Sequence, residues 1–436
     1  MRVVPCRCRN RGSRRDGPNQ SSRGIRHRNA PRFGVRFVIA AICGSARPSL
    51  PALFWALLVL VPHGAALAQV DFRGELVGSL VGTDADSDAA PGEEGSEEAN
   101  GLASLRYLPE LLAEARIKGR TGLAFLGSAN LTATATRTVA DEWLTDSEAE
   151  LYRLWARLAS PRVEFRVGLQ KIAFGSATLL RPLQWFDELD PRDPLQLTDG
   201  VQAGLFRYTA LNNTNLSLWV LYGNEEVRGW DVVPSDPDEV EYGGRIQFPL
   251  FKGELGLSYH HRQLDFSEVL PVIPPEPATP PEHRVGLDGK WDVGIGLWFE
   301  GTVIERETEL LPYRYRHMLT LGADYTFNLG TGLTALGEHF RLQESNDLFG
   351  RGETVQITAL SMTYRTSIVD QLSFIASHEW EGDESSFFFE WRRTWDRWRL
   401  HLIGFATPEG GAVLGGPPTD ALYSGNGLQV VVVFNH

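Results

Sequence analysis

The chain has 436 residues, 42% of them hydrophobic and 22% charged, with a formal net charge of −13. This composition is typical of a folded protein and excludes a disordered chain, and the acidic balance argues against nucleic acid as a partner. All three cysteines, Cys6, Cys8 and Cys43, lie within the first 68 residues, so the remainder has neither a disulfide framework nor a thiolate metal site.

Residues 1–68 differ sharply from the rest, because they hold twelve arginines and a single acidic residue. Arg47 precedes an apolar run from Leu53 to Val61, and the small residues of Ala66-Leu67-Ala68 follow it. This order predicts a secretory signal peptide that is cleaved before Gln69. A membrane anchor is the alternative, but the run is shorter than the ~20 residues of a spanning helix. The arginine-rich part before the signal is unusually long, which points to a true start downstream of Met1.

After residue 68 the apolar residues recur with a period of two, which indicates β-strands. In "ELYRLWARLASPRVEFRVGLQK", a two-residue turn at Ser160-Pro161 sorts apolar and polar side chains onto opposite faces of a hairpin, and a slip of one residue would destroy that sorting. The register predicts a salt bridge between Arg157 and Glu164. It also predicts a cation–π contact between Arg166 and Trp155.

A second hairpin follows the same rule. The stretch "VEYGGRIQFPLFKGELGLSYHHRQ" forms two alternating strands around a tight turn near Leu250-Phe251. The polar face of this hairpin places Glu241 opposite His260, and the apolar face places Tyr242 opposite Tyr259.

Comparable hairpins recur along the whole remaining chain, with short turns and longer polar or proline-rich connections in alternation. This pattern predicts an all-β fold, a transmembrane antiparallel β-barrel with short periplasmic turns and long extracellular loops. About eighteen strands fit between Val70 and Phe434, although sixteen remain possible because residues 102–137 are difficult to divide. A soluble sandwich or propeller is the alternative. No repeat of the ~40–50 residues of a propeller blade is visible, and Trp391, Trp395 and Trp398 crowd a short turn as an interfacial girdle would.

One block carries a family resemblance. The sequence "RVGLQKIAFGSATLLRPLQWFDELDPRDPLQLTDGV", followed by "LNNTNLSLWVLYGN", resembles a region of porin-like outer-membrane proteins from Gram-negative bacteria. The layout of residues 69–436 is similar to the broad class that includes phosphate-selective and alginate-export barrels. The resemblance implies one barrel domain in the bacterial outer membrane, in contact with its lipid. Such barrels usually end on Phe or Trp, whereas here Asn435 and His436 follow Phe434.

If the apolar face of each strand meets lipid, the polar face lines the lumen. The candidate pore-lining residues are Arg153, Arg157, Glu164, Arg166, Gln170, Glu241, Arg245, Glu254, His260 and Arg262. Two interpretations stay open: the charges brace a water-poor interior, or they line a wet channel whose arginines concentrate anions. The size of the barrel favours the wet channel.

The stretch "FDELDPRDPLQLTDG" packs five acidic residues into a long connection. Because the preceding "ATLLRPLQWF" is too apolar to extend into water, residues 174–198 are expected to fold into the barrel mouth or to pack on its rim, as constriction loops do. A divalent-cation site and a catalytic site are the alternatives, and neither is favoured, because nearby arginines neutralise part of the acidic charge. The candidate residues of this loop are Arg181, Trp185, Asp187, Asp190, Arg192, Asp193 and Asp199.

The functional hypothesis is a porin-like channel for passive diffusion of small polar or anionic solutes. The alternative is a non-conducting structural or assembly barrel that docks another envelope protein. A lipid-modifying enzyme of the outer membrane is a third possibility. The sequence holds neither G-x-S-x-G, H-E-x-x-H nor a phosphate-binding glycine loop, so we expect no enzyme, no cofactor and no metal site.

Overall fold

The computed structural model describes residues 66–84, 99–138, 143–267, 279–408, 423 and 425–436. The segment predicted to lie before the signal cleavage site falls almost entirely outside this part of the chain. Within the described residues, no helix has the length and hydropathy needed to cross a bilayer.

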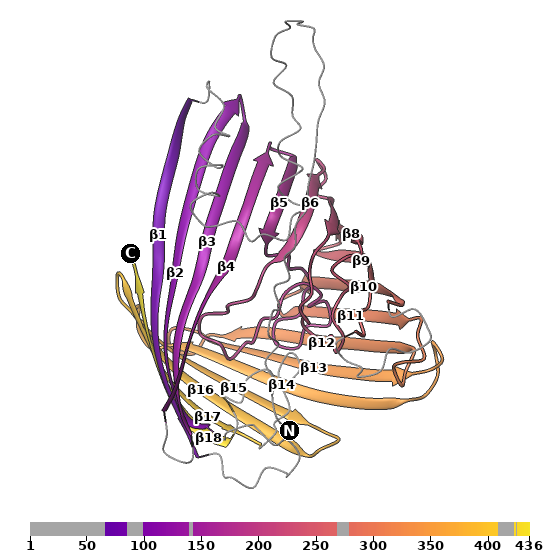
Figure 1. The fold of residues 1–436 in the computed structure, drawn as a ribbon. Coiled ribbons are helices and arrows are strands. Elements are labelled where there is room, and N and C mark those ends of the chain that lie inside the picture. Colours follow the sequence, from indigo (N-terminus) through magenta and orange to yellow (C-terminus); the bar gives the residue numbers. More distant parts are fainter. Residues whose placement is uncertain (1–65, 85–98, 139–142, 268–278, 409–422, 424) are drawn as a thin grey trace, which may run out of the picture. The chain divides into compact units, whose positions relative to one another are not determined.

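The described residues form eighteen strands that follow one another along the chain (Figure 1). The strands are β1 (Ala66–Thr83), β2 (Ala99–Lys118), β3 (Thr121–Thr138), β4 (Trp143–Ala159), β5 (Val163–Gln170), β6 (Val201–Thr209), β7 (Asn215–Leu221), β8 (Glu241–Leu250), β9 (Gly253–Gln263), β10 (Pro281–Asp292), β11 (Gly296–Arg306), β12 (Tyr315–Phe327), β13 (Leu333–Ser345), β14 (Glu353–Arg365), β15 (Asp370–Glu379), β16 (Glu384–Thr394), β17 (Trp398–Thr407) and β18 (Gly425–Asn435).

Every strand pairs antiparallel with its neighbours in the sequence, and the sheet closes on itself. The closing seam joins β1 to β18, with Glu75 opposite Asn435 and Thr83 opposite Gly427. Closure removes the free sheet edges that a bilayer does not tolerate. The prediction of an all-antiparallel barrel is confirmed, and of the two predicted strand counts eighteen is right.

The predicted hairpin registers are wrong by two residues, although the faces are right. In the first hairpin Leu158 lies opposite Phe165, and the backbone N–H of Ser160 donates to the carbonyl of Val163 at 2.8 Å. The turn is therefore Pro161-Arg162 and not Ser160-Pro161. Proline fits the first central position of a turn and not the second. Moving the turn by one residue shifts each partner by two, which leaves each side chain on its face.

The second hairpin deviates in the same way. Tyr242 lies opposite His261, and not opposite Tyr259 as predicted. The turn is Phe251-Lys252, and Phe251 has a φ of 56°. Both strands still direct their tyrosines outward and their charged residues inward.

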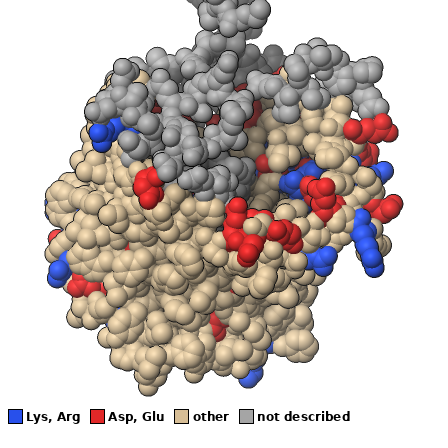
Figure 2. Space-filling view, turned by 90° about the horizontal axis from the view of Figure 1, so that it is seen from below, with Lys and Arg blue, Asp and Glu red and all other residues tan. Residues whose placement is uncertain are grey.

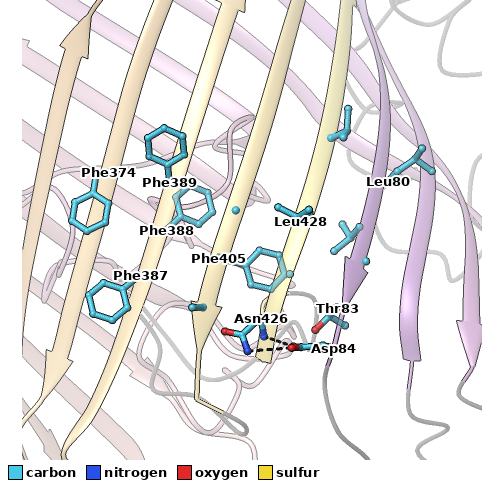
Figure 3. A pocket seen from close by; sticks show the side chains of 16 residues that line it. Leu80, Thr83, Asp84, Phe374, Phe387, Phe388, Phe389, Phe405, Asn426 and Leu428 are labelled. Atoms are coloured by element: carbon cyan, nitrogen blue, oxygen red, sulfur yellow. Dashed lines mark hydrogen bonds between the residues drawn. The ribbon is translucent and has the colours of Figure 1, made fainter.

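The outer surface of the barrel is apolar, as contact with lipid requires. Phe387 and Phe389 on β16 and Val430 on β18 are 48%, 47% and 38% exposed. These side chains line a shallow outer groove of about 940 Å³ (Figure 3). Charged side chains are sparse over most of the face in Figure 2.

Aromatic side chains mark the short-turn end of this apolar surface. The rings of Trp398 and Phe434 lie 4.6 Å apart, and Trp395 in the adjoining turn is 47% exposed. The two last residues continue the seam, since the N–H of His436 donates to the carbonyl of Gly74 at 3.1 Å.

Candidate functional site: the barrel interior

The connection between β5 and β6, residues 171–200, lies inside the barrel; we call it the inward loop. Its apolar residues Leu180, Leu183, Trp185 and Phe186 are between 0% and 2% exposed. A connection with no regular strand or helix is buried only where its backbone polar groups find partners. Those partners are inward-facing side chains of strands across the lumen.

Two carboxylates anchor the first half of the inward loop. Glu338 on β13 accepts hydrogen bonds from the backbone N–H groups of Thr178, Leu179 and Leu180 at 2.7, 2.9 and 2.7 Å. It also accepts the indole N–H of Trp298 at 2.9 Å. A carboxylate held by several N–H donors forms strong, charge-assisted hydrogen bonds. The loop is thereby fixed to the wall opposite its own strands.

Glu300 on β11 is the second anchor. It accepts the N–H groups of Ser176, Ala177 and Leu183 at 2.7, 2.8 and 2.6 Å. Gly175, one residue earlier, has a φ of 111°, and a Cβ there would lie 2.3 Å from a Glu300 oxygen. Only glycine therefore allows this close approach of the chain to the carboxylate.

An aromatic cluster holds the middle of the inward loop against β7 and β9. Phe174 stacks on Trp219 with ring centroids 5.5 Å apart, and Phe186 meets His260 edge-on at 4.9 Å. The indole N–H of Trp219 donates to Nδ1 of His260 at 3.2 Å, and Nε2 of His260 lies 3.1 Å from Glu241. His260 is thus held by packing and by hydrogen bonds on both ring nitrogens.

The acidic residues of the inward loop are mostly paired within the loop itself. Asp187 lies 2.8 Å from Arg181, and Asp190 lies 2.8 Å from Arg192. Asp193 accepts the N–H groups of Leu195 and Leu197 at 2.9 and 3.0 Å.

Burial nevertheless raises the pKa of Asp193, against the lowering effect of those two N–H groups. The last acid of the stretch, Asp199, is exposed. Among the described residues, no group of three His, Cys, Asp or Glu side chains could hold a metal ion.

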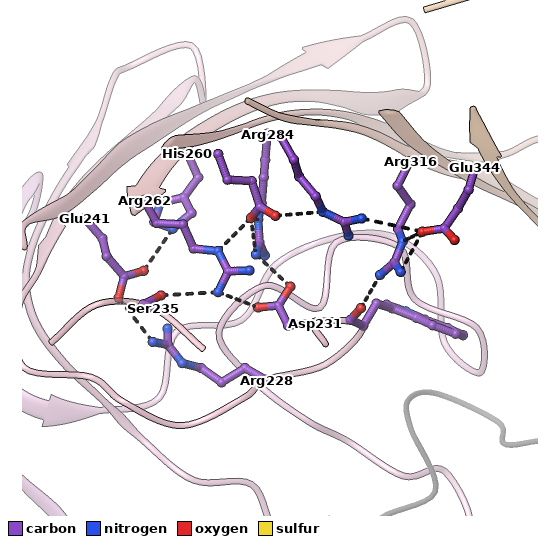
Figure 4. Close-up of polar contacts among 12 residues, drawn as sticks. Arg228, Asp231, Ser235, Glu241, His260, Arg262, Arg284, Arg316 and Glu344 are labelled. Carbon is purple, nitrogen blue, oxygen red and sulfur yellow. Dashed lines mark hydrogen bonds and ion pairs between the residues drawn. The ribbon is translucent and has the colours of Figure 1, made fainter. Parts of the chain in front are cut away.

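A second connection, residues 222–240 between β7 and β8, also contributes buried residues to the interior. Its Asp231 lies 2.7 Å from Arg284 and 3.1 Å from Arg262 (Figure 4). Glu282 on β10 bridges the same two arginines at 2.7 and 2.6 Å. These charges are almost fully buried, and each depends on the others because an unpaired buried charge is costly.

The opposite wall of the lumen carries a large apolar cluster. On β13–β18 and β1 the inward positions include Phe340, Ile375, Phe405, Val431 and Val77, each at most 7% exposed. They form one cluster with Leu179 and Leu180 of the inward loop. The expectation of a polar face lining the lumen therefore describes β4–β12 better than this wall, where the apolar cluster lies beside inward polar residues such as Glu338, Glu390 and His401.

The structure places the ten predicted pore-lining residues in two groups. The buried group consists of Arg153, Gln170, Glu241, Arg245, His260 and Arg262. Each of these side chains already makes a hydrogen bond or an ion pair within the protein. Arg153, for example, donates to the carbonyl of Thr198. The remaining four, Arg157, Glu164, Arg166 and Glu254, are more accessible.

Two contacts predicted among these residues have different outcomes. The guanidinium of Arg166 lies 4.8 Å from the ring centre of Trp155, so the predicted cation–π contact is present. The predicted Arg157–Glu164 salt bridge is wrong, because the observed register places Arg157 opposite Arg166. Glu164 instead lies 2.8 Å from Arg166, and Arg157 lies 3.4 Å from Glu114.

Sequence reasoning missed the residues that anchor the two inward connections. Glu338 shares the lumen face of its strand with Phe340, Leu342 and a second acid, Glu344, so alternation gives it no special weight. The proline-rich stretch before β10 predicts a connection that extends to His283. In the structure β10 already begins at Pro281 and includes Glu282 and Arg284. The mixture of charge and apolar bulk in "VRGWDVV" resembles that of the inward loop and could have marked residues 222–240 as buried.

Comparison with known proteins supports the fold alone. No family model matches the chain. No curated protein matches it either. Among solved structures, OccAB3 of Acinetobacter baumannii gives a TM-score of 0.52 at 10% identity, covering 84% of this chain and 99% of its own. OccK5 of Pseudomonas aeruginosa gives 0.51 at 11% identity, covering 84% and 98%. With its closed eighteen-stranded barrel and apolar exterior, the chain has the porin-like fold of bacterial outer-membrane β-barrels.

Proposed function

We propose that the chain is an outer-membrane channel for passive diffusion of small polar or anionic solutes, with the inward loop as its constriction. The observation that carries the proposal is a loop fixed across the lumen of a closed barrel by wall carboxylates. In the proposed channel this loop narrows the passage, and selectivity depends on the charges beside it.

The accessible charges support a preference for anions. Arg157, Arg166 and Arg207 face the lumen on neighbouring strands. Among the described residues, the acids within 4.0 Å of these three arginines are Glu114 and Glu164. Positive side chains along a confined water path raise the local concentration of anions. The buried arginines near Asp231 contribute less, because acidic partners neutralise them.

The test is electrical conductance in planar lipid bilayers. Purified protein, checked for a folded barrel by its heat-modifiable mobility on gels, is expected to give stepwise current increases. In a salt gradient the reversal potential should indicate anion preference. Folded protein that inserts into the bilayer and yields no current steps would refute the channel.

A second candidate is a non-conducting barrel that serves as a structural or assembly scaffold. The specific observation in its favour is the apolar cluster on the lumen wall of β13–β18, because wetting such a surface is unfavourable. The same bilayer experiment separates the two functions.

A further inference from the structure

A cavity of about 460 Å³ lies under the start of the inward loop. Residues of β5–β8 and residues 172–174 line it, and the Pro161-Arg162 turn borders it. The cavity therefore lies toward the short-turn end of the barrel. A volume of this size is at the lower end of small-molecule sites.

Charged and polar side chains form a row across this cavity. Register pairs place Glu164 opposite Arg207, Arg207 opposite Ser217, and Ser217 opposite Arg245. Arg245 is occupied, because its guanidinium donates to Asp288 at 2.9 Å. Its charge is thus already neutralised.

In this row, Arg207 is the cation whose guanidinium lacks hydrogen-bond partners. Its one acidic partner among the described residues is Glu164, at 4.0 Å, and Arg166 holds the same carboxylate more closely, at 2.8 Å. In that part of the chain the guanidinium of Arg207 makes no hydrogen bond, and neither does the side-chain amide of Gln247 or the hydroxyl of Ser217. A guanidinium with five free donors is suited to bidentate recognition of an oxyanion.

The inner end of the cavity is apolar. Leu205 and Trp219 line it from the wall, and the ring of Phe174 stacks on that of Trp219 at 5.5 Å. All three side chains are buried or half-buried. A ligand here would thus meet a cationic side and an aromatic floor within one small volume.

We propose that this cavity binds a small organic anion, whose oxyanion group meets Arg207, Ser217 and Gln247 and whose apolar part lies on Phe174 and Trp219. The inference deepens the proposed channel function, on which it rests for the solute's access to the lumen. It assigns the channel a binding step on the short-turn side of the constriction.

Hexanoate tests the proposal by calorimetric titration of the folded protein in detergent, with protein-free micelles as the blank. Hexanoate should bind more tightly than acetate, which lacks the apolar part, and than hexanamide, which lacks the charge. Arg207→Gln should weaken hexanoate binding by roughly 10-fold or more, the value of a charge-assisted hydrogen bond. Arg392→Gln, an inward arginine on β16 outside the cavity, is the matched control and should bind as the unmodified protein does.

Absence of binding heat, equal affinities for hexanoate and acetate, or an unchanged affinity in Arg207→Gln would each overturn the proposal. If Arg207→Gln does not fold, Ser217→Val carries the test, because it removes a hydroxyl next to Arg207 and adds apolar bulk; unchanged hexanoate binding would then count against the site. Protein that conducts but binds no hexanoate refutes this cavity only. Protein that binds hexanoate but does not conduct refutes the channel and leaves the cavity.

Discussion

Replacement of Glu338 by alanine is expected to release the first half of the inward loop. The change leaves the N–H groups of Leu179 and Leu180 and the indole N–H of Trp298 buried without their acceptor. Each unsatisfied buried donor costs about 1–3 kcal/mol. Water from the lumen can replace part of this loss, so the docking of the loop should weaken by roughly 3 kcal/mol, the lower end of the summed range.

A loss of that size shifts the ratio of docked to released loop by roughly 100-fold. The direct assay is amide hydrogen exchange followed by mass spectrometry, which should show faster exchange in residues 176–183 while the strands stay protected. Current recordings should show larger and noisier steps. Glu338→Gln keeps one acceptor oxygen, so its exchange in residues 176–183 should be faster than in the unmodified protein and slower than in the alanine variant. Glu390→Gln on β16, away from the loop, is the control. Unchanged exchange in residues 176–183 of the alanine variant would refute the anchoring role of Glu338.

Three further perturbations test other parts of the molecule. Arg157→Ala and Arg166→Ala should each shift the reversal potential in a salt gradient away from anions, and an unchanged potential would remove these residues from selectivity. Arg284→Met breaks two buried ion pairs and should cost about 3–5 kcal/mol, measured as a lower thermal unfolding midpoint. The exposed Arg314→Met is the comparison and should leave the midpoint nearly unchanged, because solvent screens its ion pair. Burial raises the pKa of Asp193. The stability that the protonated Asp193 contributes is therefore present at low pH and is lost as the pH rises above about 4 and through the folded pKa. Over that range the unfolding midpoint of the unmodified protein should fall relative to that of Asp193→Asn, and parallel pH profiles would contradict this.

The sequence allowed the strands, their faces and the barrel to be predicted, because alternation reports which side of a strand meets lipid. It did not allow the partner of each residue to be predicted, since a turn displaced by one residue, as at Pro161, preserves the alternation. Contacts across the lumen could not be predicted from the sequence either. The carboxylate of Glu338 meets Thr178, 160 residues earlier in the chain, and no local pattern encodes that approach.

The apolar cluster on the lumen wall could not be predicted from the sequence for a related reason. Val431 and Val433 alternate with Val430 and Val432, and a strand that is apolar on both faces carries no signal of which face is inside. Burial of the inward side depends on what packs against it, here the inward loop and its neighbours. That information exists only in the assembled barrel.

The anchoring of the inward loop has a consequence for synthesis and export. Leu180, Leu183, Trp185 and Phe186 leave the ribosome and cross the inner membrane long before their partners do, since Ser176 and Glu300 are 124 residues apart in sequence. Until β11 and β13 arrive, this stretch is an exposed apolar segment of a chain that has not yet closed. Such segments aggregate readily. We therefore expect this stretch to promote aggregation of the unclosed chain more than any single strand does, because alternation dilutes the apolar side chains of a strand.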